Sequence, residues 1–159
     1  MEKGKKLPDE YPCEIYDLII KDGGAERTFE NVYRIAEKGK LNRDAFLSSF
    51  QEKRIKNSCE NSYNNRDAFL AEKEVVDIGD YSTSCFQKRR NAKKILKLKA
   101  RHEDGPKILI GTILPETGLS MLTAESRSNR MAMDSHIDWW IYQGVDPSPY
   151  FRYELKEED

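Results

Sequence analysis

The most conspicuous candidate for chemistry is a run of cations in the middle of the chain. Between Phe86 and Arg101 there is no acidic residue, and the run includes Lys88, Arg89, Arg90, Lys93, Lys94 and Lys97. A helix of this composition can neutralise phosphates without reading a base sequence. The interleaved Ala92, Ile95 and Leu96 are spaced for one helix face. The run therefore fits either a phosphate-binding helix or a solvated helix that packs this apolar stripe inward.

Three shorter segments combine residue types that catalytic sites use. They are Tyr33-Arg34, Tyr81-Ser-Thr-Ser84, and Asp134-Ser-His-Ile-Asp138 followed by Trp139 and Trp140. Ser84 or Cys85 with His136 and Asp138 supplies the residue types of an acyl-transfer triad, in which a base activates a nucleophile. The glycines of a nucleophile elbow are missing around both candidate nucleophiles.

In their order along the chain, these segments resemble the mono-ADP-ribosyltransferase superfamily of the Arg–Ser–Glu type, over about residues 30–153. Members place an Arg on the first core strand, a Ser-Thr-Ser-like strand next, and an acidic residue on a later strand. Here a predicted helix follows the Ser-Thr-Ser segment. A strand beginning Lys107-Ile-Leu-Ile then precedes the acidic segment, and Tyr142 to Phe151 is similar to the closing hairpin.

The resemblance implies a role for each of these residues in NAD chemistry. Arg34 would bind the NAD pyrophosphate through its guanidinium fork, and Ser82 and Ser84 would shape the nucleotide site. An aromatic ring, here Trp139, would stack on nicotinamide. The acid would stabilise the positive charge on ribose as nicotinamide leaves. The family has Glu at that place, whereas here it is Asp138, with His136 beside it.

Each of these residues also has a structural interpretation. Arg34 can be an ion-pair partner on the surface, and Ser-Thr-Ser is a common polar face of a strand. His136 and Asp138 can form an ordinary hydrogen bond. Trp139 and Trp140 are expected on opposite faces of a strand, one in the core and one at the edge.

Composition limits the classes of protein. Charged residues make up 35% of the 159 residues, but 27 Lys and Arg balance 28 Asp and Glu, and 8 Tyr, 6 Phe and 2 Trp supply core material. Such a chain is expected to fold rather than remain disordered. Three widely spaced cysteines and two histidines predict neither a disulfide framework nor a metal site. We expect a cytoplasmic protein without a membrane segment.

The elements that must position these residues follow from local patterns. Strands are expected at Glu14–Ile20, Asn31–Ala36, Tyr81–Phe86, Lys107–Leu114 and Ile137–Tyr142, with a short one near Phe151. Leu119–Ala124 is expected to pair with Lys107–Leu114 as a hairpin. Helices are expected from Asn42 and over Gln87–Ala100, with a loop over Lys53–Asn65. The hexamer Asn-Arg-Asp-Ala-Phe-Leu occurs at 42–47 and again at 65–70, as two similar helix starts or as a duplicated unit.

These elements predict one α+β domain over residues 13–153, with a mixed or mostly antiparallel sheet and two or three flanking helices. Residues 1–12 are expected to be a flexible lead-in and 154–159 an acidic tail. The leading functional hypothesis is an NAD-dependent ADP-ribosyltransferase-like domain that modifies a macromolecule, as toxins and regulators of that family do. The alternative is a non-enzymatic module that binds nucleic acid or a protein partner through residues 88–101.

Overall fold

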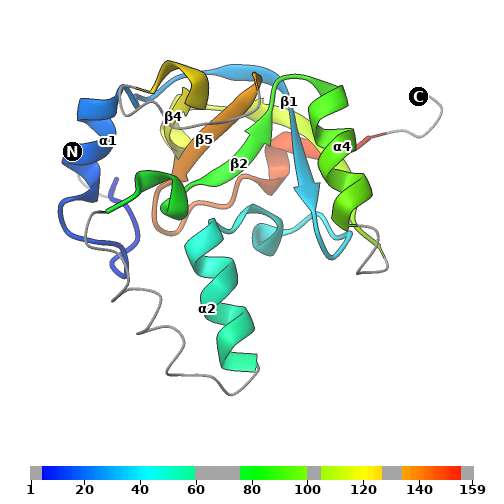
Figure 1. The fold of residues 1–159 in the computed structure, drawn as a ribbon, viewed down its shortest axis with the longest axis horizontal. Coiled ribbons are helices and arrows are strands. Elements are labelled where there is room, and N and C mark those ends of the chain that lie inside the picture. The colour runs from blue at the N-terminus through cyan, green and yellow to red at the C-terminus, as the bar shows by residue number, and fades with distance from the viewer. Residues whose placement is uncertain (1–4, 60–75, 100–104, 127–133, 155–159) are drawn as a thin grey trace.

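Six strands form one antiparallel sheet in the computed structural model, which describes residues 5–59, 76–99, 105–126 and 134–154 (Figure 1). The strands are β1 (Phe29–Ala36), β2 (Thr83–Phe86), β3 (Lys107–Ile113), β4 (Gly118–Leu122), β5 (His136–Ile141) and β6 (Phe151–Tyr153). Their order across the sheet is β4-β5-β2-β1-β3-β6. With the helices described below, this confirms the predicted single α+β domain.

The sheet consists of two halves that meet between β1 and β2. On one side β3 pairs with β1 along its length, and on the other β5 pairs with β2 from Thr83 to Phe86. Between β1 and β2, by contrast, the register contains the single pair Tyr33 and Phe86. The strand of Arg34 (β1), the strand that Ser82 directly precedes (β2) and the strand of Asp138 (β5) therefore lie side by side, although the β1–β2 pairing is short.

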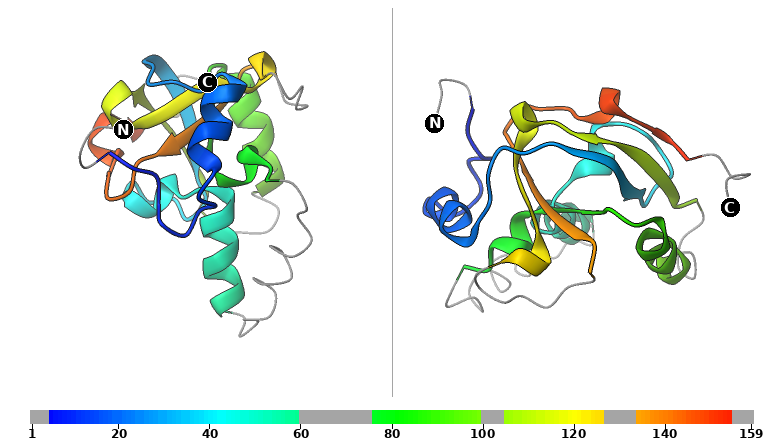
Figure 2. Two further views of the ribbon diagram at one scale, coloured as in Figure 1. Left: turned by 90° about the vertical axis from the view of Figure 1, so that its left-hand side faces the viewer. Right: turned by 90° about the horizontal axis from the view of Figure 1, so that it is seen from above.

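Three α-helices lie among the described residues: α1 (Ile15–Asp22), α2 (Ser49–Cys59) and α4 (Arg89–Lys99). Figure 2 shows α1 and α4 at opposite ends of the sheet. Helix α1 ends at Gly23, whose φ of 118° is the left-handed conformation that favours glycine at a helix C-terminus. The predicted helix over Gln87–Ala100 is confirmed as α4.

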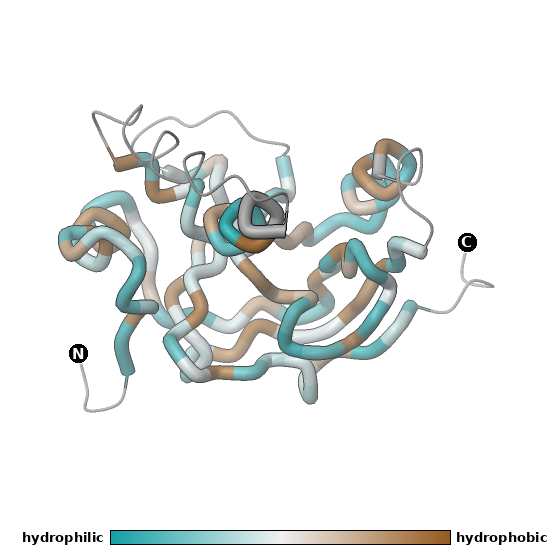
Figure 3. Tube along the Cα trace, turned by 90° about the horizontal axis from the view of Figure 1, so that it is seen from below, coloured by the Kyte–Doolittle hydropathy of each residue, from teal (hydrophilic) through white to brown (hydrophobic). Residues whose placement is uncertain are grey.

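The two faces of the sheet bury different clusters. Trp139 lies in one cluster with Phe46, Leu109 and Phe151. Trp140 lies in another, where it packs with residues of α1 such as Ile19. Both indole side chains are fully buried, so the predicted split across the faces is confirmed and the predicted edge position is wrong. Figure 3 shows hydrophobic and hydrophilic residues alternating along the coils of the helices.

The segment Glu14–Ile20 is helical rather than extended. Its Ile15 and Ile19 are four residues apart and lie on one side of α1, where both are buried. Burial of this stripe outweighs the strand propensity of β-branched residues. The lead-in also differs from expectation, because Leu7 and Tyr11 are buried in the same cluster and Tyr11 Oη donates to Ser48 Oγ at 2.7 Å.

The predicted pairing of residues 119–124 with 107–114 is wrong. Strand β4 pairs with β5, with Leu119 opposite Trp140, while β3 lies between β1 and β6. The helix expected from Asn42 has the predicted N-cap, since Asn42 Oδ1 accepts from Asp44 N, but it is a single 3-10 turn, η1 (Arg43–Phe46). The loop expected over Lys53–Asn65 is wrong for 53–59, which belong to α2, and its remainder lies outside the described residues. The second hexamer, at 65–70, and residues 155–159 of the tail lie outside the described residues.

Candidate functional site

Five side chains, from the start of β2, from β5 and from the residue after β4, form one chain of hydrogen bonds in which the buried Asp138 carboxylate is bound by two hydroxyl groups. Asp138 Oδ1 accepts from Ser82 Oγ at 2.6 Å, and Oδ2 accepts from Thr123 Oγ1 at 2.5 Å. Thr123 Oγ1 also lies 2.6 Å from His136 Nδ1. His136 Nε2 in turn lies 2.9 Å from Ser84 Oγ. We call Ser82, Ser84, Thr123, His136 and Asp138 the polar network.

The side chains of the polar network differ in solvent exposure. Asp138 and Ser82 are each 1% exposed, whereas Ser84 and His136 are half-buried. Two hydroxyl donors meet the buried carboxylate, which offsets the cost of removing a charge from water. A ligand would therefore meet the imidazole and the Ser84 hydroxyl, with the carboxylate behind them.

Strand register explains why these residues converge. Ser84 stands opposite Asp138 in the β2–β5 ladder, and residues two apart in a strand share a face. Ser82 and Ser84 therefore point the same way as His136 and Asp138. Thr123 follows β4, in which Met121 stands opposite Asp138. Sequence reasoning missed Thr123 because the β4–β5 pairing that brings it to this face has no local signal.

Arg34 is not brought into the polar network. Its Nε donates to the Ala45 carbonyl at 2.8 Å, and its terminal nitrogens donate to the carbonyls of Leu47 at 3.3 Å and Ser84 at 2.9 Å. The neighbouring Tyr33 packs on the α4 side with Phe86, so Arg34 projects from the opposite face of β1. At 8% exposure, this guanidinium holds η1 against the sheet.

Trp139 is also separated from the polar network. Alternation along β5 directs it to the face opposite Asp138, where its exposed fraction is 0%. Its Nε1 donates to Thr117 Oγ1 at 3.2 Å, and its ring stacks with Phe151. The ring is therefore enclosed by the core and not open to a nicotinamide, which corrects the stacking role expected from the sequence.

Lys88 and the first two cations of α4 form ion pairs with acidic residues. Lys88 and Arg90 both bind Asp134 Oδ2, at 2.6 and 3.0 Å, and Arg89 binds Glu154 at 2.7 Å. Lys94 and Lys97 are exposed, Lys93 is half-buried, and the stripe of Ala92, Ile95 and Leu96 packs inward as expected. Pairing reduces the net positive charge at the start of the helix, which weakens the case for a helix dedicated to nucleic acid.

The start of α4 is fixed to the segment that leads into His136. Ser135 Oγ accepts from Lys88 N at 3.2 Å and donates to Asn91 Oδ1 at 2.9 Å, and Gln87 N donates to the Ser135 carbonyl. Hydrogen bonds from Lys88 hold the pKa of Asp134 below its ordinary value. Asp134, the carboxylate that pairs with Lys88 and Arg90, therefore lies two residues before His136 in the sequence.

Cys85 is not available as a nucleophile. It is fully buried on the face of Trp139, and burial raises the pKa of its thiol to about 12. Iodoacetamide at pH 8 is expected to modify the exposed Cys13 in the native protein and leave Cys85 unmodified. Peptide mass spectrometry checks this, with the urea-unfolded protein as the control in which Cys85 reacts. Native labelling of Cys85 at the rate of Cys13 would contradict the burial.

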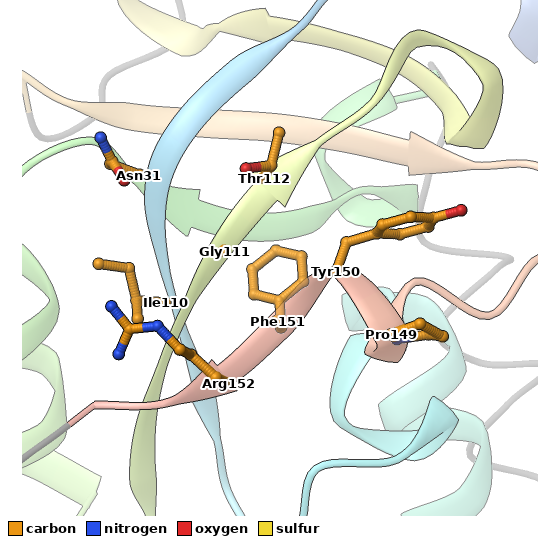
Figure 4. Close-up of a pocket in the computed structure, with 8 residues that line it drawn as sticks. All are labelled: Asn31, Ile110, Gly111, Thr112, Pro149, Tyr150, Phe151 and Arg152. Atoms are coloured by element: carbon orange, nitrogen blue, oxygen red, sulfur yellow. The ribbon is translucent and has the colours of Figure 1, made fainter.

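A depression of about 370 Å³ lies elsewhere, where β1, β3 and β6 meet (Figure 4). Its lining includes Asn31, Thr112, Tyr150 and Arg152, and Asn31 has a positive φ of 54° at the bulge in β1. None of the candidate site residues named from the sequence lines it. The lining of this depression includes no nucleophile beside a base and no carboxylate. The polar network therefore remains the candidate site.

Within residues 5–59, 76–99, 105–126 and 134–154, no group of three or more His, Cys, Asp and Glu side chains could hold a metal ion. Over the same residues, no helix combines the length and the apolar character needed to cross a bilayer.

Comparisons of the chain with protein families, with curated proteins and with solved structures found no match.

Proposed function

We propose that this protein is an ADP-ribosyltransferase-like domain that binds NAD at the polar network. The observation that carries the proposal is the convergence of Ser82, which directly precedes β2, with Asp138 on β5, their side-chain oxygens being 2.6 Å apart. The resemblance in the sequence implies these parts on neighbouring strands. Their adjacency supports the proposal because nothing in the local sequence determines which strands become neighbours.

The proposed reaction breaks the bond between the ribose C1′ and the nicotinamide nitrogen. The bonding electrons leave with nicotinamide, and positive charge develops on the ribose, where the negative Asp138 favours it electrostatically. The acceptor oxygen or nitrogen then forms a bond to C1′ and gives its proton to His136 Nε2. His136 is the accessible base of the polar network, and Asp138 acts from behind it because its carboxylate is 1% exposed.

We assign the NAD pyrophosphate to Lys88 and Arg90 rather than to Arg34. Two cations share the single carboxylate of Asp134, so one positive charge remains in excess there. A pyrophosphate can replace the exposed Asp134 carboxylate and take charge-assisted hydrogen bonds from both side chains. Arg34 keeps its three carbonyl partners in this arrangement. The acceptor class, a protein or a nucleic acid, is proposed from the resemblance alone.

Titration calorimetry of the full chain with NAD tests the proposal, together with chromatographic measurement of released nicotinamide. H136A is expected to lower nicotinamide release about 100-fold, the contribution of a general base. The double variant K88A/R90A is expected to weaken NAD binding. K94A/K97A is the matched control, since it removes two exposed cations of the same helix. Absence of saturable binding at millimolar NAD, or equal affinity in all variants, would contradict the proposal.

A further inference from the structure

The Thr123 hydroxyl lies between the carboxylate of Asp138 and the imidazole of His136. Its oxygen is 2.5 Å from Asp138 Oδ2 and 2.6 Å from His136 Nδ1. Thr123 is 4% exposed, so these contacts are made away from bulk solvent. The imidazole and the carboxylate are thus connected through one hydroxyl group.

The number of hydrogens available fixes the direction of each hydrogen bond. An ionised carboxylate only accepts, so the single hydroxyl hydrogen of Thr123 is directed to Asp138. The same oxygen can then only accept from His136, which requires a hydrogen on Nδ1. A neutral imidazole carries one N–H, so Nε2 has the lone pair. At 2.9 Å, Ser84 Oγ is placed to donate its hydrogen to that lone pair.

We propose that Thr123 is a positioning residue that holds His136 in its Nδ1–H form, so that Nε2 is a base directed at Ser84 Oγ. Asp138 sets this orientation through the threonine hydroxyl. The hydrogen that Nε2 accepts comes from the Ser84 hydroxyl or from an acceptor group that replaces it. The role of this base in ADP-ribosyl transfer rests on the proposed function, whereas the tautomer of His136 does not.

Two-dimensional ¹H–¹⁵N NMR of the imidazole side chains in the full chain tests the tautomer directly. The sequence has two histidines, so a His102→Gln variant assigns the signals of His136. We expect Nδ1 to be the protonated nitrogen of neutral His136 in the unsubstituted protein. T123V removes the hydroxyl at nearly constant volume and is expected to abolish this preference. T123S restores the hydroxyl and is expected to restore the preference.

Nicotinamide release gives the second readout. T123V is expected to lower the rate at least about tenfold with little change in NAD affinity, and T123S to recover it. A protonated Nε2 in the unsubstituted protein overturns the inference, as does an unchanged tautomer in a folded T123V. If T123V does not fold, the NMR spectrum of the unsubstituted protein still determines which tautomer His136 adopts. Absence of NAD turnover together with the Nδ1–H form would reject the proposed function and retain the tautomer inference.

Discussion

Replacing Arg34 with alanine is expected to lower the free energy of unfolding by about 3 kcal/mol or more. The substitution removes three charge-assisted hydrogen bonds and leaves the carbonyls of Ala45, Leu47 and Ser84 without this donor. A buried polar group that loses its partner costs about 1–3 kcal/mol. Phe46, fully buried inside η1, loses part of its support as well.

Urea unfolding followed by tryptophan fluorescence measures this loss. R34K keeps the charge but not the planar guanidinium, so its free energy of unfolding is expected to lie between those of R34A and the unsubstituted protein. R27A is the matched control: Arg27 is on the surface, lies over the Phe29 ring and pairs with Glu125. If R34A were as stable as the unsubstituted protein but no longer bound NAD, Arg34 would be a ligand-binding residue, as the sequence suggested.

Replacing Trp139 with alanine is expected to lower the free energy of unfolding by about 3–5 kcal/mol, as for other fully buried aromatic residues. Its ring packs edge-on against Phe46 and stacks with Phe151 across the core. W139F keeps most of the side-chain volume but loses the hydrogen bond to Thr117, so its free energy of unfolding is expected to be lower by about 1–2 kcal/mol.

Thermal unfolding of both variants measures these differences, and NAD titration of folded W139F separates packing from binding. Because Trp139 faces away from the polar network, W139F is expected to bind NAD with the affinity of the unsubstituted protein. A loss of affinity at unchanged stability would show that the indole contacts the nucleotide after all.

Elements with strong local signals were predictable from the sequence. The basic, apolar-striped α4, the apolar β3 and the Asn42 cap all follow from residue type and spacing. The error at Ile15–Asp22 arose because β-branched residues favour strands locally, while Ile15 and Ile19 gain more by packing as one helix face.

The candidate site was predictable only in part, because strand pairing is not a local property. Ser82, Ser84, His136 and Asp138 were identified by type, and the β2–β5 ladder brings them together. The contribution of Thr123 depends on β4 pairing with β5 instead of β3, which long-range packing decides. Arg34 lies on the face opposite the polar network because Tyr33 stands opposite Phe86 in β2 and Arg34 stands opposite Leu109 in β3, and none of these strands specifies its register alone.

Ser84 forms hydrogen bonds that connect the two halves of the sheet and also its two faces. Its carbonyl accepts a hydrogen bond from Arg34, which lies on β1 and also binds the Ala45 carbonyl of η1. Its hydroxyl lies next to His136 Nε2 on the other face. The β1–β2 register contains only the pair Tyr33 and Phe86, so the hydrogen bond from Arg34 to Ser84 adds a second link between these two strands. One residue of β2 therefore contacts both the arginine that supports η1 and the candidate base, so a substitution of Arg34 is expected to disturb the Ser84 hydroxyl on the opposite face of the sheet.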